Sequence, residues 1–171
     1  KKPPARRVDL IFRAYDEGIA FRYFLPKQEV LETFALAAEN SGFHFPKNSS
    51  ALILDMGRFN THNEGEYLWT RLDEIKPSQI INLPVVIEIP GGPWVALLEA
   101  DLIDYGGMYV SGVSSIANAL VSWLSMPPRK ESLARNITTA ERALREQPVV
   151  GATPKATPWR VLMVSPTPGR L

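Results

Sequence analysis

The chain has 171 residues, 45% of them hydrophobic and 22% charged, which is the composition of a globular protein that can bury a core. Its 19 basic and 18 acidic side chains leave a formal net charge of +1, so the chain lacks the basic excess with which proteins bind nucleic acid or anionic membranes. The absence of cysteine excludes disulfides, zinc–thiolate sites and thiol nucleophiles. The charge balance therefore predicts no nucleic-acid partner. No stretch approaches the ~20 apolar residues that a membrane span needs, so we also expect no membrane span.

The first half of the chain alternates apolar and polar residues with the period of two that is typical of β-strands. In the segment 7–26, two alternating runs flank the break at 16–18, which predicts a β-hairpin. A second hairpin is predicted at 83–102, around the Pro-Gly-Gly-Pro turn. Further strands are predicted at 49–57, 64–75, 107–113 and 161–165, while 29–37 fits either a strand or a short helix.

Only the segment 131–147 is strongly compatible with a helix, and the β-branched residues at 137–139 interrupt it. The chain also contains 15 prolines, mostly between predicted strands, which fits many short strands joined by turns. The pattern therefore predicts an all-β fold of the β-sandwich type. Because the strand pattern begins close to the first residue and a strand and a turn end the chain, we expect a partial domain.

Three acidic residues, Glu99, Asp101 and Asp104, follow an apolar run within a short stretch. If 94–102 is a strand, Glu99 continues the apolar face of Val95 and Leu97, with Asp101 about 7 Å further along that face. A carboxylate on such a face must be paired, protonated or bound to a cation. Spacing alone favours an ion pair between Glu99 and an arginine across the sheet, with Asp101 and Asp104 capping the next turn. A calcium site is the alternative, and this chain alone would not complete it.

Other candidate residues favour structural roles. His44 and His62 lack the neighbouring ligands of a metal site and are expected at the surface or in hydrogen-bonded loops. Glu64 and Glu66 fit a solvated strand edge. The tryptophans could stack on sugar rings, although in a β protein they more often belong to the core: Trp69, Trp94, Trp123 and Trp159.

Three segments resemble the N-terminal domain of glycoside hydrolase family 97. They are VDLIFRAYDEGIAFRYFLP at 8–26, LLEADLIDYGGMYV at 97–110 and TPWRVLMV at 157–164, and their order and spacing also agree with that family. The resemblance implies a super-sandwich of the galactose-mutarotase-like type. Residues 1–171 would form the N-terminal β-sandwich domain of a larger glycoside hydrolase, whose catalytic (β/α)8 barrel is not in this chain.

Members of that family hydrolyse α-glucosides or α-galactosides and hold calcium at the active site with glutamates, one of which comes from the N-terminal domain. The resemblance matches that ligand to Glu99 and so raises the calcium interpretation of Glu99 above the ion pair. It implies an α-linked oligosaccharide as substrate and a periplasmic or secreted location. No catalytic residue is predicted in this chain, because the acid and base would belong to the barrel.

Two further interpretations stay open. The chain could be a stand-alone carbohydrate-binding β-sandwich without enzymatic activity, in which aromatic side chains bind sugar and Glu99 is an ordinary paired acid. It could also be a purely structural sandwich, which predicts no ligand. A gene that ends soon after Leu171 would favour the first of these, and a following barrel with paired glutamates would exclude it.

Overall fold

The computed structural model describes residues 5–59, 61–125 and 149–171. Strands make up almost all of the regular structure in these ranges, which confirms the predicted all-β class. The strands are β1 (Asp9–Tyr15), β2 (Gly18–Leu25), β3 (Thr33–Leu36), β4 (Gly42–His44), β5 (Ser50–Asp55), β6 (Leu68–Arg71), β7 (Ile81–Glu88), β8 (Trp94–Ala100), β9 (Met108–Gly112), β10 (Ala119–Leu124), β11 (Val149–Ala152), β12 (Lys155–Ala156) and β13 (Trp159–Ser165). Two short 3-10 helices are η1 (Leu72–Glu74) and η2 (Pro168–Arg170).

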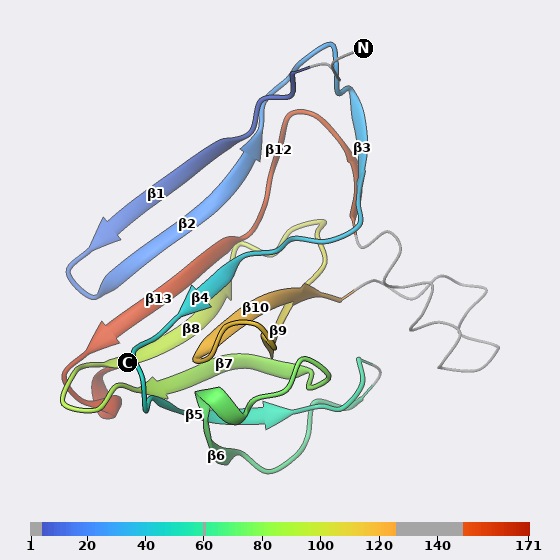
Figure 1. Cartoon of the computed structure of the whole chain (residues 1–171). Coiled ribbons are helices and arrows are strands. Elements are labelled where there is room, and N and C mark those ends of the chain that lie inside the picture. The colour runs from blue at the N-terminus through green and yellow to red at the C-terminus, as the bar shows by residue number, and fades with distance from the viewer. Residues whose placement is uncertain (1–4, 60, 126–148) are drawn as a thin grey trace.

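A single large antiparallel sheet dominates the described part of the chain. Its main path runs β1-β2-β13-β8-β7-β9-β10-β4, with β5 pairing β7, β6 pairing β5, and β12 pairing β2. A separate two-stranded sheet joins β11 to β3. In Figure 1 the β1–β2 hairpin lies at one end of the molecule, and β5 and β6 lie at the other. Strand β13, the last in the chain, lies inside the main sheet between β2 and β8.

The main sheet curls, so that strands distant in sheet order face one another. The ring of Phe43 on β4 lies 6.1 Å from the ring of Phe21 on β2, although five strands separate β4 from β2 along the path. Apolar side chains from both parts fill the space between them. This core includes Phe43, Ala51, Ile53, Leu72, Ile81, Val85, Ile87, Val95, Leu97, Met108, Val110 and Leu120.

Both predicted hairpins are confirmed. β1 and β2 pair through a turn at Asp16 and Glu17, and β7 and β8 pair around the Pro-Gly-Gly-Pro turn. The ambiguous segment 29–37 contains strand β3, and the segment 64–75 contains β6 followed by η1. The predictions at 49–57, 107–113 and 161–165 correspond to β5, β9 and β13. The helix prediction at 131–147 lies outside the described residues.

Four short strands were not predicted from the sequence: β4, β10, β11 and β12. β10 shows why, because four of its six residues are buried and these include neighbours along the strand. A strand that is covered on both faces has no alternation of apolar and polar residues. Within the described ranges, no helix has the length and hydrophobicity needed to cross a membrane.

Candidate functional site

Glu99 lies near the end of β8, directly opposite Arg160 of the neighbouring strand β13. Val95 and Leu97 on the same face of β8 are buried, and the side chain of Glu99 is only 10% exposed. The carboxylate thus continues the core face of the strand, as the alternation predicted. An acid in such a place needs a partner, because an unpaired buried charge is costly.

The partner is Arg160, whose side chain is completely buried. Its Nη1 donates a hydrogen bond to Oε1 of Glu99. Its Nε and Nη2 donate to the two carboxylate oxygens of Glu39, each at 2.7 Å. The guanidinium therefore binds Glu39 through two parallel hydrogen bonds, which is the strongest geometry of an arginine–carboxylate pair. Its remaining nitrogen, Nη1, binds Glu99. The predicted ion pair between Glu99 and an arginine across the sheet is confirmed.

Glu39 is held by further donors. The hydroxyl of Tyr105 donates to Oε2 of Glu39 at 3.1 Å, and the hydroxyl of Ser41 donates to Oε1 at 2.8 Å. The backbone carbonyl of Glu39 accepts a bond of 2.5 Å from Ser122 on β10. We refer to Glu39, Glu99, Tyr105 and Arg160 as the Arg160 cluster. Glu99 and Arg160 lie on the neighbouring strands β8 and β13, and Ser122 on β10 anchors the segment that carries Glu39.

The Arg160 cluster carries unequal charge. In formal charges, the carboxylates of Glu39 and Glu99 contribute −2 and the guanidinium +1, so the formal net charge is −1. Burial alone would lower the pKa of Arg160, but the hydrogen bonds and charge of Glu39, and then those of Glu99, raise this pKa above its ordinary value. Burial raises the pKa of the Tyr105 hydroxyl well above its usual range, and the charge of Glu39 adds to this effect. Tyr105 therefore stays protonated as a donor.

The second oxygen of Glu99, Oε2, accepts a hydrogen bond of 3.1 Å from the backbone N–H of Met108. Each carboxylate oxygen can accept more than one contact, so this arrangement leaves Glu99 able to bind a cation as well. Among the described residues there is no group of three or more acidic or histidine side chains that could hold a metal ion. These residues would thus fit calcium as the source of one carboxylate and not as a complete site, since calcium takes about 6–8 oxygen ligands.

Asp101 and Asp104 lie in the connection between β8 and β9, and each pairs with a basic residue of another strand. Asp101 pairs with Arg22 at 3.3 Å, and Asp104 pairs with Lys155 at 3.1 Å. Both aspartates have positive φ angles, 61° and 50°, which aspartate tolerates better than most residues. The prediction that Asp101 shares a strand face with Glu99 is wrong, because β8 ends at Ala100 and the chain turns there.

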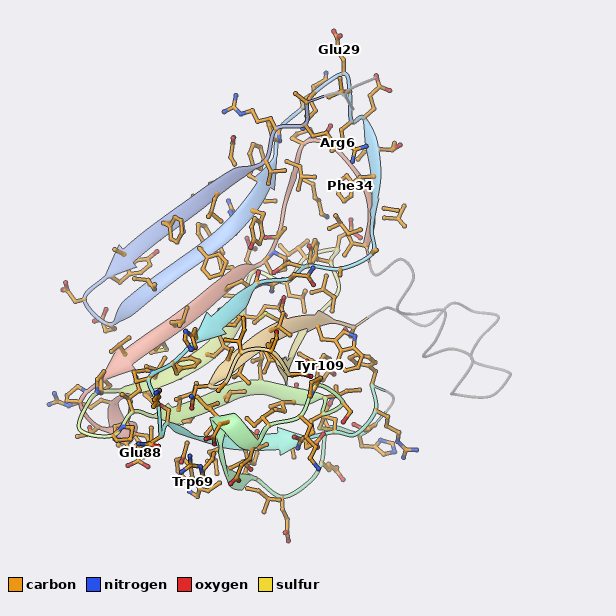
Figure 2. All side chains as sticks on the ribbon, viewed as in Figure 1. Arg6, Glu29, Phe34, Trp69, Glu88 and Tyr109 are labelled. Atoms are coloured by element: carbon orange, nitrogen blue, oxygen red, sulfur yellow. The ribbon has the colours of Figure 1, made fainter. Side chains whose placement is uncertain are left out.

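The other candidates divide between surface and core. His44 is exposed on β4, and His62 is exposed in the loop before β6. Trp159 is buried, as predicted for a core tryptophan. The same prediction is wrong for Trp69, which is 53% exposed and lies at the outer edge of the molecule (Figure 2). Its ring lies 5.8 Å from that of Trp94. Among the described strands, β6 pairs with β5 alone, so fewer neighbouring strands cover its side chains.

Glu39 and Arg160 were not predicted from the sequence as site residues. Arg160 did leave a signal, because it is the one charged residue in the apolar strand Trp159–Ser165. Glu39 lies outside any strand and left none. The three segments that carry the family resemblance meet here: 97–110 supplies Glu99 and Tyr105, 157–164 supplies Arg160, and 8–26 supplies Tyr23, whose hydroxyl lies 3.1 Å from that of Ser41.

Comparison with protein families and curated sequences gives a consistent picture. A family model described as glycosyl-hydrolase 97 N-terminal matches residues 1–171. A retaining alpha-galactosidase of Bacteroides thetaiotaomicron is 27% identical over 168 residues, an alignment that covers 91% of this chain and 25% of the relative. The chain thus spans about a quarter of the length of this curated relative.

Solved structures show the same fold. A glycoside hydrolase family 97 enzyme from Pseudoalteromonas sp. strain K8, in complex with acarbose, superposes with a TM-score of 0.74 at 21% identity, covering 94% of this chain and 21% of that chain. A beta-arabinopyranosidase superposes with a TM-score of 0.72 at 24% identity, covering 94% of this chain and 25% of that chain.

Proposed function

Because the chain belongs to the N-terminal domain family of glycosyl-hydrolase 97, we propose that it is the non-catalytic part of a larger enzyme that hydrolyses α-linked glucosides or galactosides. The alpha-galactosidase relative, of which this chain matches 25%, supports this proposal. The catalytic acid and base lie in a (β/α)8 barrel of the same parent chain, and the parent is periplasmic or secreted. The substrate is an α-linked oligosaccharide.

The test is hydrolysis by the full-length parent protein. We expect release of nitrophenol from p-nitrophenyl α-galactoside or α-glucoside, because two carboxylates in the barrel can protonate the leaving oxygen and attack or activate water. The matched control is p-nitrophenyl β-glucoside, on which we expect no activity. Activity on neither α-glycoside would overturn the proposal. In that case, sugar binding without hydrolysis would favour a carbohydrate-binding module.

We further propose that Glu99 supplies one ligand to calcium at the active site of the parent protein. Two observations support this. The Arg160 cluster carries a net charge of −1, which a bound cation would balance. The carboxylate of Glu99 is also the more exposed of the two, since its side chain is 10% exposed against 6% for Glu39. The other ligands come from the rest of the parent chain. A cation held there would supply positive charge close to the leaving oxygen.

Glu99→Gln keeps the size of the side chain and removes the charge. We expect this variant of the full-length protein to bind calcium at least about tenfold more weakly, because hard cations prefer charged oxygen ligands. Titration calorimetry with calcium chloride measures the change. Asp104→Asn is the matched control, since Asp104 is an exposed acid of the following connection and its carboxylate pairs with Lys155. Native affinity in Glu99→Gln would refute the role of Glu99.

A further inference from the structure

We propose that Arg160, held by Glu39, to which Tyr105 donates, is a positioning residue that fixes the carboxylate of Glu99 for cation binding. This inference rests on the proposed role of Glu99 in binding calcium. It assigns a function to Arg160, Glu39 and Tyr105, which would themselves not touch the ion.

The guanidinium of Arg160 has a fixed orientation. A guanidinium is planar, and its donors have fixed directions. In Arg160, Nε and Nη2 both donate to Glu39 at 2.7 Å, so the plane of the group is set by Glu39. The direction of Nη1, which donates to Glu99, is then set as well. Glu39 thus determines the direction from which Glu99 is held.

Glu39 itself is held in place by several buried contacts. Its side chain is 6% exposed, and both of its oxygens accept a second donor, from Ser41 at 2.8 Å and from Tyr105 at 3.1 Å. Its backbone carbonyl is bonded to Ser122. Rotation of Glu39 would break several buried hydrogen bonds at once, and each buried group left without a partner is costly. The carboxylate of Glu39, which binds Arg160, is therefore fixed in orientation.

Both carboxylate oxygens of Glu99 are hydrogen-bonded. Its two oxygens are held from different elements, Oε1 by Arg160 on β13 and Oε2 by the backbone of Met108 at the start of β9. Two donors on two oxygens fix the plane of the carboxylate. A carboxylate fixed before binding loses little conformational entropy when a cation arrives, which is the physical advantage of a preorganised site.

A purely stabilising role explains this arrangement less well. Buried ion pairs contribute little net stability, because desolvation of the charges offsets their attraction. The Arg160 cluster also places a second carboxylate on one guanidinium, which adds a buried negative charge that no described cation balances. A role in fixing the orientation of Glu99 explains why one guanidinium binds both carboxylates.

The test is a double-mutant cycle on the full-length protein, read by calorimetric titration with calcium chloride. Arg160→Lys keeps the charge and loses the planar fork, so a role in charge alone predicts little change, whereas positioning predicts roughly tenfold weaker binding. In a Glu99→Gln background we expect Arg160→Lys to cause no further loss, because its effect acts through Glu99. Tyr105→Phe keeps every charge and removes one donor to Glu39. We expect a smaller loss in the same direction, and this variant serves if Arg160→Lys does not fold.

The outcomes separate the two proposals. Native affinity in Glu99→Gln would overturn the calcium role itself. Weak binding in Glu99→Gln, together with native affinity in Arg160→Lys or Tyr105→Phe, would keep that role and overturn the positioning. Losses that simply add in the double variant would also overturn the positioning, because Arg160 would then act independently of Glu99.

Discussion

Arg160→Met is expected to destabilise this domain by about 3–5 kcal/mol, the usual cost of removing one partner from a buried ion pair. The variant leaves the carboxylates of Glu39 and Glu99 buried together without the cation that holds both. Native-state hydrogen exchange of the full-length protein, followed by mass spectrometry on peptides from β8 and β13, measures the local opening free energy. The measurement is made in chelator, so that no bound metal ion compensates.

Arg71→Met is the control for this prediction. Arg71 also pairs with a carboxylate, Asp73, at 2.6 Å, but its side chain is 47% exposed and water screens the pair. We expect no measurable change in exchange for this variant. If Arg160→Met exchanged at the native rate, the two carboxylates would not depend on Arg160 for their burial, and the description of the Arg160 cluster would be wrong.

Gly112→Ala is the second substitution with a large expected effect. A Cβ at position 112 would lie 1.8 Å from the backbone carbonyl oxygen of Ile75, which belongs to the segment after η1. The N–H of Gly112 also donates to the carbonyl of Lys76 at 3.3 Å, so the two backbones are held together at this point. Because both groups are backbone, neither can rotate away. We expect a loss of about 3 kcal/mol or more, at the upper end of the cost of overpacking.

The midpoint of thermal unfolding and the exchange of β9 peptides in the full-length protein check this expectation. Gly42→Ala is the matched control, since it lies on the edge strand β4 and a Cβ there meets nothing within 4 Å. We expect its effect to stay within about 0.5 kcal/mol. Equal stability of the two variants would show that the approach of β9 to residue 75 is looser than described.

The predictable parts of this fold are those encoded over short distances. The β1–β2 hairpin has alternating residues and a glycine, Gly18, at its turn, and the β7–β8 hairpin has the Pro-Gly-Gly-Pro turn. Each hairpin is encoded within about twenty residues, so its strands and its turn can be recognised from local sequence alone. Strand β10 lacked such a signal, because burial on both faces removes the alternation.

The candidate site was only half predictable for a related reason. The position of Glu99 on an apolar face follows from alternation within one strand, and a pairing arginine follows from the cost of a buried charge. The identity of that arginine depends on which strand lies beside β8, and β13 is 61 residues further along the chain at the pairing position. Glu39 is 121 residues from Arg160 and lies in no strand, so only the folded chain brings them together.

The most direct test of the account is a crystal structure of the full-length protein grown with calcium chloride. We predict a calcium ion with an oxygen of Glu99 at about 2.3–2.6 Å, while Arg160 still bridges Glu99 and Glu39. The result that would contradict the account is a calcium ion bound at the active site without Glu99, whose carboxylate contacts only Arg160 and the backbone of Met108.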